Sequence, residues 1–167
     1  LASLADSVST TLADVSALAI VGNGSTIEVL VASLSETGLT RLSVDVSNLG
    51  SALAATDGGQ SLIGTMADDV IVGGMAADML TGAAGDDILV DGGGSDFLTG
   101  GAGADMFVFK ADGQTDTIMD FEPGIDVLDL SDFALLYHPS QLTASAQSWG
   151  VRLSWQSEVI DVYRAGG

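Results

Sequence analysis

Five aspartates recur at intervals of nine residues, and their type and spacing point most directly to chemistry in this sequence. They are Asp69, Asp78, Asp87, Asp96 and Asp105. Carboxylate oxygens are the hard, anionic ligands that cations such as calcium prefer. A carboxylate at the same point of every repeat therefore predicts a row of cation sites built from oxygen ligands.

The aspartates belong to a nonapeptide repeat that runs without a gap from Gly64 to Val108 as GTMADDVIV, GGMAADMLT, GAAGDDILV, DGGGSDFLT and GGAGADMFV. Positions 1 to 4 are almost all small, and position 6 is aspartate. Position 8 is large and apolar: Ile71, Leu80, Leu89, Leu98 and Phe107. Glycine permits the positive φ angles of a tight turn with inward carbonyl oxygens. Each nonapeptide is therefore expected to form a turn and a three-residue strand, so that two repeats complete one coil of 18 residues.

Such coils would stack the aspartates in two rows, Asp69 over Asp87 over Asp105 on one edge and Asp78 over Asp96 on the other. Neighbouring strands lie about 4.8 Å apart. Like charges at that separation repel by roughly 3–4 kcal/mol at an effective dielectric constant of about 20. A divalent cation between each pair reverses the sign of this interaction. Zinc is not favoured, because the chain has one His and no Cys, so the expected cofactor is Ca²⁺, with several ions between stacked turns.

The five nonapeptides resemble the calcium-binding repeats of RTX (hemolysin-type) proteins, G-G-x-G-x-D-x-U-x. The segment GADMFVFKADGQTDTIMDFEPGIDVLDLSDF, residues 103–133, looks like the one that closes the roll in the C-terminal domains of serralysin-type secreted peptidases. There Asp116, Asp120 and Asp126 occupy positions where the family tends to place further acids. The resemblance implies an all-β fold: a parallel β-roll, a calcium-bound solenoid of 18-residue coils, flanked by short antiparallel β segments. The expected metal-site residues are Asp69, Asp78, Asp87, Asp96, Asp105, Asp116, Gly74, Gly85, Gly92, Gly94, Gly101 and Gly103.

Several repeats depart from the pattern. Asp91 replaces the first glycine of the fourth repeat, and Thr65 and Ala83 replace the second glycine of the first and third. Alanine also stands at position 4 in Ala67 and Ala76, at a cost wherever the turn needs a left-handed backbone. Upstream, ATDGGQSLI keeps the frame but has Gln60 at position 6. This segment is expected to be a degenerate first turn without a full calcium site.

Composition excludes several classes of partner. The chain has 167 residues, 23 acidic against 4 basic, and a formal net charge of −19. Nucleic acids and anionic membrane surfaces would repel it. The chain is nevertheless 47% hydrophobic, unlike a disordered acidic tail. No apolar run approaches the roughly 18 residues of a membrane span. No basic segment of a signal peptide is visible, and the missing initiator Met is taken to indicate an excised piece of a longer protein.

The flanks divide the chain into three predicted regions. Residues 1–54 form a β-rich N-terminal flank, with strands near Ala17–Val21, Thr26–Ser33 and Leu39–Val46. Their predicted loops are GNGS and SETG. This flank is expected either to pack on the roll as a small antiparallel sheet or to complete an upstream domain. The start of this flank fits either a short amphipathic helix or a strand. Residues 55–133 form the roll and its closing segment, and residues 134–167 a C-terminal hairpin of GVRLSW and EVIDVY around Gln156-Ser157.

Positions 7 and 9 of the repeats should point out of the roll, yet they are apolar. They are Val70, Val72, Met79, Ile88, Val90, Phe97, Met106 and Val108. A fully solvated face is seldom so apolar. Part of this face is therefore expected to be covered, with the two flanks as the candidates within the chain.

No catalytic motif stands out. There is no G-x-S-x-G, no H-E-x-x-H and no phosphate-binding loop, and His138 is the single histidine. No catalytic or organic cofactor-binding residue is therefore assigned, and the chain is not expected to be an enzyme.

The sequence favours a secreted, extracellular calcium module that folds on binding calcium and supports secretion and stability of a larger protein. The RTX resemblance adds the type I secretion machinery as a partner, with the secretion signal in the C-terminal region. The alternative is the C-terminal part of a secreted hydrolase that contributes to substrate binding.

Overall fold

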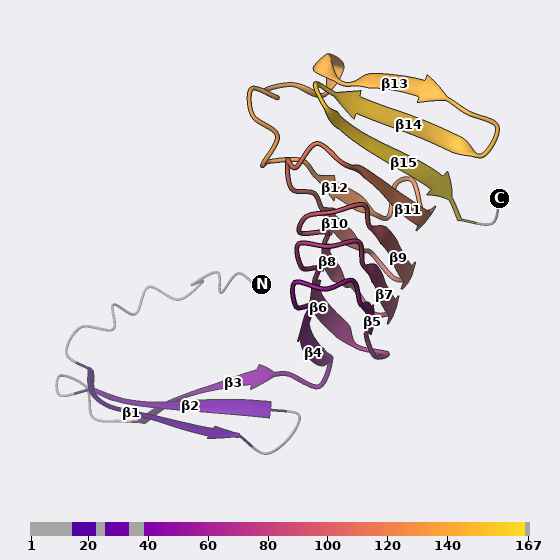
Figure 1. Ribbon diagram of the computed structural model, residues 1–167. Coiled ribbons are helices and arrows are strands. Elements are labelled where there is room, and N and C mark those ends of the chain that lie inside the picture. Colours follow the sequence, from indigo (N-terminus) through magenta and orange to yellow (C-terminus); the bar gives the residue numbers. More distant parts are fainter. Residues whose placement is uncertain (1–14, 23–25, 34–38, 166–167) are drawn as a thin grey trace. The chain divides into compact units, whose positions relative to one another are not determined.

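The computed structural model describes residues 15–22, 26–33 and 39–165, and their regular structure is nearly all β-strand (Figure 1). The chain divides into two compact units, Leu1–Asn48 and Leu49–Gly167. No helix in the described part has the length and apolar character needed to cross a membrane.

The first unit contains a three-stranded antiparallel sheet in the order β1-β2-β3. The strands are β1 (Val15–Gly22), β2 (Thr26–Ser33) and β3 (Leu39–Asp45). The three predicted N-terminal strands are thus confirmed to within about two residues at each end. Of the two predicted loops, three of the four residues of GNGS and all of SETG lie outside the described residues, as do the first fourteen residues.

The second unit is a roll of two parallel sheets, between which the chain alternates. The first sheet has the order β12-β10-β8-β6-β4. Its strands are β4 (Leu49–Ala54), β6 (Asp68–Val72), β8 (Ile88–Val90), β10 (Met106–Val108) and β12 (Val127–Asp129). The parallel strands of the second sheet include β5 (Ser61–Ile63), β7 (Met79–Ala84), β9 (Phe97–Ala102) and β11 (Thr115–Phe121). Figure 1 shows the resulting stack of coils between β4 and β12.

The register of the strands gives the coil length. Ile71 pairs with Leu89 and Leu89 with Phe107, while on the other sheet Leu80 pairs with Leu98. The expected parallel β-roll with an 18-residue spacing is therefore confirmed. Beyond the last repeat the coils lengthen, since Leu98 pairs with Ile118, twenty residues along.

The core is the space between the two sheets, filled by position 8 of every repeat. These five side chains are at most 1% exposed, and Phe109, Ile118, Phe133 and Ile160 extend the same cluster. Period-two alternation sends one apolar side chain inward from each three-residue strand. Burying each contributes about 1.5–3 kcal/mol, so stability grows with every coil added.

The C-terminal strands extend the second sheet. They are β13 (Thr143–Ala146), β14 (Gly150–Trp155) and β15 (Glu158–Arg164), preceded by a 3₁₀ turn at Pro139–Gln141. β14 and β15 form the predicted antiparallel hairpin around Gln156-Ser157. β15 also pairs in parallel with β11, so that the hairpin continues the sheet beyond the last coil.

The outward apolar side chains are only partly covered. Val70, Met79, Phe97 and Met106 are between 37% and 58% exposed. Their neighbours Val72, Ile88, Val90 and Val108 are half-buried. The C-terminal hairpin adds strands to the edge of the second sheet. Exposed apolar side chains remain on the outer faces of both sheets, Val70 and Met106 on the first and Met79 and Phe97 on the second.

Candidate metal centre

The repeated aspartates link successive coils along both edges of the roll. On one edge the backbone N–H of Asp69 donates to Oδ1 of Asp87 (2.7 Å), and that of Asp87 donates to Oδ1 of Asp105 (3.0 Å). On the other edge the N–H of Asp78 donates to Oδ1 of Asp96 (2.7 Å). The two rows therefore contain the aspartates predicted from the nine-residue repeat, and one hydrogen bond joins each aspartate to the next one in its row.

Each row continues past the repeats. Asp96 donates to Oδ1 of Asp116 (3.0 Å), and Asp105 donates to Oδ1 of Asp126 (3.1 Å). At the other end of the second row, the backbone N–H of Gln60 donates to Oδ1 of Asp78 (2.7 Å). The degenerate first turn thus caps the row without adding a carboxylate.

The acidic side chains of the rows are buried. Asp69, Asp78, Asp87, Asp96, Asp105 and Asp116 are 1–3% exposed. Buried charges are normally paired with an opposite charge or bound to a metal. The ion pairs seen in the described residues lie elsewhere, between Lys110 and Asp132 (3.9 Å) and between Arg152 and Asp161 (2.7 Å). Only backbone and hydroxyl donors are seen to satisfy the row carboxylates.

The second carboxylate oxygens divide the aspartates into two groups. Oδ2 of Asp69 accepts a hydrogen bond from the backbone of Thr65, and Oδ2 of Asp78 accepts one from Gly74 (2.7 Å). Oδ2 of Asp87, Asp96 and Asp105 is buried and has no hydrogen-bond partner. A buried polar atom without a partner is costly, and a bound ion is one of the arrangements that satisfies it.

A backbone carbonyl converges with one of these unpartnered oxygens. A Cβ placed on Gly82 would lie 2.2 Å from Oδ2 of Asp87 and 2.6 Å from the carbonyl oxygen of Gly100, one coil along. The first position of this repeat must therefore be glycine. Two oxygens that face the same small space offer the mixed carboxylate and carbonyl ligands of a hard cation.

The predicted turn glycines adopt the expected backbone in five of six cases. Gly85, Gly92, Gly94, Gly101 and Gly103 have φ angles between +91° and +140°. Gly74 is not among the positive-φ residues, and its N–H donates to Asp78. Ala83 adopts φ +92°, so the cost expected for alanine applies there. Ala67 and Ala76 do not have positive φ, and the cost does not apply to them.

Burial shifts the acidity of the row carboxylates. Burial raises the pKa of Asp96 and of Asp105 to about 6, with a further rise from the neighbouring aspartates. The pKa of Asp116 is raised to about 7 for the same reasons. For Asp69, burial raises the pKa, but hydrogen bonds from Thr65 and Ser51 outweigh it and leave the pKa below its usual value. Without a cation, burial therefore disfavours the charged form of Asp96, Asp105 and Asp116.

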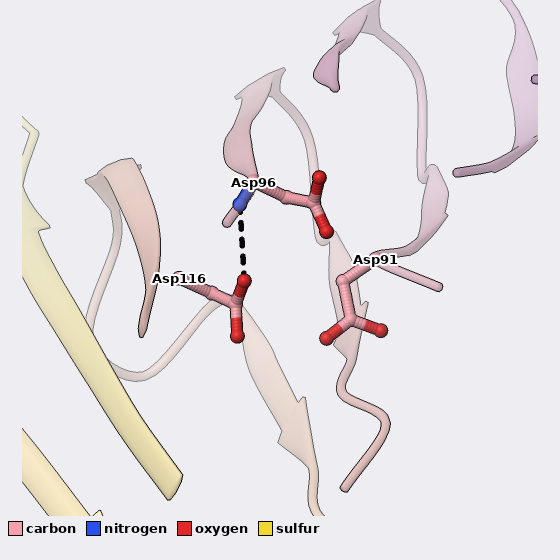
Figure 2. A group of neighbouring side chains, drawn as sticks. All are labelled: Asp91, Asp96 and Asp116. Atoms are coloured by element: carbon pink, nitrogen blue, oxygen red, sulfur yellow. Dashed lines mark hydrogen bonds between the residues drawn. The ribbon is translucent and has the colours of Figure 1, made fainter. Parts of the chain in front are cut away.

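A group of three carboxylates lies at the C-terminal end of the second row (Figure 2). One oxygen from each of Asp91, Asp96 and Asp116 lies within 4.8 Å of the other two, and all three residues are buried. Sequence reasoning treated Asp91 as a departure from the glycine pattern and did not assign it to the site. The sequence does contain a signal for this role: Asp91 is an acid at position 1 of the repeat, where a side chain has to lie against the edge of the coil.

Other acids hold the coils together from the side. Asp120 accepts hydrogen bonds from the backbone of Gly100 (3.0 Å) and Gly101 (2.9 Å). At position 5, Asp68 accepts from the N–H of Asp86 (2.9 Å), and Asp86 from that of Ala104 (2.9 Å). The adjacent pairs Asp68-Asp69 and Asp86-Asp87 thus place one carboxylate in the buried row and the other in a more accessible one.

The single histidine has a local structural role. His138 is exposed and caps the 3₁₀ turn, where its Nδ1 accepts a hydrogen bond from the backbone N–H of Ser140 (3.2 Å). Its other side-chain contact is with the hydroxyl of Ser140 (2.9 Å). This arrangement accounts for His138 as a turn cap.

One family of known domains matches most of the chain. The model of the peptidase M10 serralysin C-terminal family matches residues 23–161. The chain belongs to this family. The serralysin-type resemblance of the repeats and closing segment is thereby confirmed, and it extends over most of the chain. No curated protein matches the sequence.

Two solved structures are similar to this serralysin C-terminal domain. The solution structure of the AlgE6R3 subunit from the Azotobacter vinelandii mannuronan C5-epimerase is 30% identical, with a TM-score of 0.48, and the match covers 63% of this chain and 70% of that one. The crystal structure of the extracellular lipase LipA from Serratia marcescens is 18% identical, with a TM-score of 0.39. That match covers 89% of this chain and 29% of the lipase chain.

Proposed function

We propose that the roll binds several calcium ions between successive turns along both edges, and that binding drives its folding outside the cell. The observation that carries this proposal is the set of buried Oδ2 atoms without partners on Asp87, Asp96 and Asp105. Carboxylate and carbonyl oxygens are hard ligands that suit calcium, which takes six to eight of them. The family assignment supports the same conclusion.

The proposed ligands are the position-6 aspartates together with turn carbonyls. Asp69, Asp78, Asp87, Asp96, Asp105 and Asp116 would supply carboxylate oxygens, and Gly74, Gly85, Gly92, Gly94, Gly101 and Gly103 belong to the turns that bring carbonyl oxygens toward them. A bound cation offsets the repulsion along each row. Without it, the rows hold like charges away from water.

Calcium then acts as a switch for folding. Binding free energy at a site that exists only in the folded state contributes directly to folding. Extracellular calcium modules bind with dissociation constants of about 10⁻⁴–10⁻³ M. The domain would remain unfolded where calcium is scarce and fold where calcium is abundant. This property suits a non-catalytic module of a larger secreted protein that leaves the cell by a type I secretion system, with the last region, 134–167, containing the signal.

Equilibrium dialysis of the whole chain tests the proposal. Several equivalents of calcium should be retained at about 1 mM free calcium, and magnesium at the same concentration should not displace them, because magnesium prefers a smaller octahedral site. Retention of no calcium by a chain that is folded would overturn the proposal.

A second function is favoured by exposed apolar side chains on the outer face of the second sheet. Met79 and Phe97 are neighbours on the paired strands β7 and β9 and are 58% and 49% exposed, and exposed apolar patches often mark contact surfaces. In this function the chain is the C-terminal part of a secreted hydrolase, and this apolar pair contributes to substrate binding. Binding of the calcium-loaded chain to immobilised polysaccharide or casein, lost in Phe97→Ser, would support it, whereas binding unaffected by that substitution would not.

A further inference from the structure

Asp91 stands where the other four repeats have glycine. The first positions of those repeats are Gly64, Gly73, Gly82 and Gly100. Asp91 is 2% exposed, so its carboxylate is held inside the roll and is not solvated. The fourth repeat therefore brings one more buried acid to its edge than any other repeat.

The additional carboxylate meets two members of the second row. One oxygen of Asp91 lies within 4.8 Å of an oxygen of Asp96 and of an oxygen of Asp116. Figure 2 shows the side chains of Asp91 and Asp116 extending toward one another, with the carboxylate of Asp96 beside them. Asp96 and Asp116 are joined by the row hydrogen bond of 3.0 Å. In the described residues this is the one group of three acids with such spacing.

The hydrogen bonds around the group leave one of its carboxylate oxygens without a partner. Asp91 accepts from the backbone N–H of Lys110 (2.9 and 3.1 Å) and of Gly92 (2.6 Å). The Nζ of Lys110 is 3.9 Å from Asp132. Oδ2 of Asp96 is buried and accepts no hydrogen bond. This unpartnered oxygen, next to two further buried carboxylates, points to a positively charged ligand.

We propose that Asp91, Asp96 and Asp116 together hold one cation, in a three-carboxylate site that is distinct from the sites between paired carboxylates elsewhere on the roll. This inference rests on the proposed calcium-binding function and adds that the sites differ in their affinity for calcium. Calcium affinity depends on the charge of the ligand set, so this site binds calcium about tenfold more tightly than the others. Trivalent lanthanum gains still more, because attraction scales with the charge of the ion.

Isothermal titration calorimetry of the whole chain with calcium tests the ranking. Asp91→Asn keeps an acceptor for the backbone of Lys110 but removes the charge. The matched control is Asp86→Asn, which removes the same charge from an exposed position-5 acid. The unaltered chain and the control should show one tight equivalent followed by weaker ones. Asp91→Asn should lose the tight equivalent and keep the weaker ones.

The outcomes separate this inference from the proposed function. If the unaltered chain binds calcium with a tight equivalent that Asp91→Asn retains, the three-carboxylate site is wrong and the calcium function stands. If the folded, unaltered chain binds no calcium, both are wrong.

A second measurement does not depend on how the variant folds. Lanthanum is titrated into the unaltered chain in the presence of saturating calcium. One equivalent should bind at least about tenfold more tightly than the rest. A titration in which all lanthanum sites are equivalent would contradict the inference.

Discussion

The backbone N–H of Asp87 donates a 3.0 Å hydrogen bond to Oδ1 of Asp105, one coil along, and Oδ2 of Asp105 has no partner. The same side chain thus joins two coils with one oxygen and leaves the other for a ligand. Because the arrangement recurs in each row, structure and cation binding depend on the same residues. The predictions below follow from this coupling.

Removing one row carboxylate should have opposite effects with and without calcium. Asp87→Asn retains an oxygen that accepts the hydrogen bond of Asp69. In calcium, the free energy of unfolding should fall by about 2 kcal/mol, since a ligand of the cation is lost. In chelator it should rise, because a buried and uncompensated charge is gone. Urea denaturation followed by circular dichroism measures both, wherever a folded population exists.

The control for this substitution is Asp86→Asn, next to it in the sequence but exposed. Its effect should stay within about 0.5 kcal/mol in calcium. Equal losses for Asp86→Asn and Asp87→Asn in calcium would show that charge near the turn matters but the buried row does not.

Acidity should affect the calcium-free and calcium-bound forms in opposite directions. Burial raises the pKa of Asp91 to about 8, of Asp116 to about 7, and of Asp96 and Asp105 to about 6. The folded calcium-free roll then holds protons that the unfolded chain has released, so its stability falls as pH rises from about 4 to about 8. Calcium needs the deprotonated carboxylates, so its affinity rises over the same range.

Thermal unfolding at pH 5 and pH 8 measures this difference. In chelator an unfolding transition of the roll should be seen at pH 5 and should weaken or vanish at pH 8, whereas the stabilisation on adding calcium should be larger at pH 8. A chelated chain that is more stable at pH 8 than at pH 5 would contradict the raised pKa values.

The strained alanine of the third repeat offers a stabilising change. Ala83 has φ +92°, which costs an L-residue roughly 1–2 kcal/mol. Ala83→Gly removes this strain and adds some flexibility to the unfolded chain, for a net gain of about 1 kcal/mol in the free energy of unfolding in calcium. Ala76→Gly, where φ is not positive, is the control and should not stabilise. Stabilisation by both substitutions, or by neither, would argue against strain at Ala83.

The inward position 8 should be far more sensitive than the outward position 7. Leu89 is 0% exposed and Val70 is 41% exposed. Leu89→Ala should lower the free energy of unfolding in calcium by about 3 kcal/mol, because it leaves a cavity between the sheets. Val70→Ala should cost less than about 1 kcal/mol. Both free energies of unfolding are measured by urea denaturation. Similar losses for the two substitutions would contradict the assignment of position 8 to the core and position 7 to the outer face.

The repeat made the roll predictable, since its period fixes both the coil length and the face on which each residue lies. Position 1, as in Gly82, is glycine in four of the five repeats, and position 8, as in Leu89, is large and apolar in all five, so one register explains both. The predicted carboxylate rows follow from the same register. The cation that these rows bind remains a prediction, because the residue types specify oxygen donors and not the identity of the ion.

The features that sequence reasoning missed depend on contacts between distant segments. Asp91 meets Asp116 across a stretch where the coils lengthen, and the nine-residue register does not extend there. The parallel pairing of β15 with β11 likewise joins residues more than forty positions apart. Strand propensity locates the C-terminal hairpin but does not determine which sheet edge it joins.

Far-UV circular dichroism of the whole chain, titrated with calcium from a chelated start and separately with magnesium, tests the central claim most directly. At pH 8 we expect little β signal from the roll in chelator and a cooperative increase with calcium but not with magnesium. A fully formed β spectrum in chelator at pH 8 that calcium does not change would contradict the claim that the buried aspartate rows couple folding to calcium.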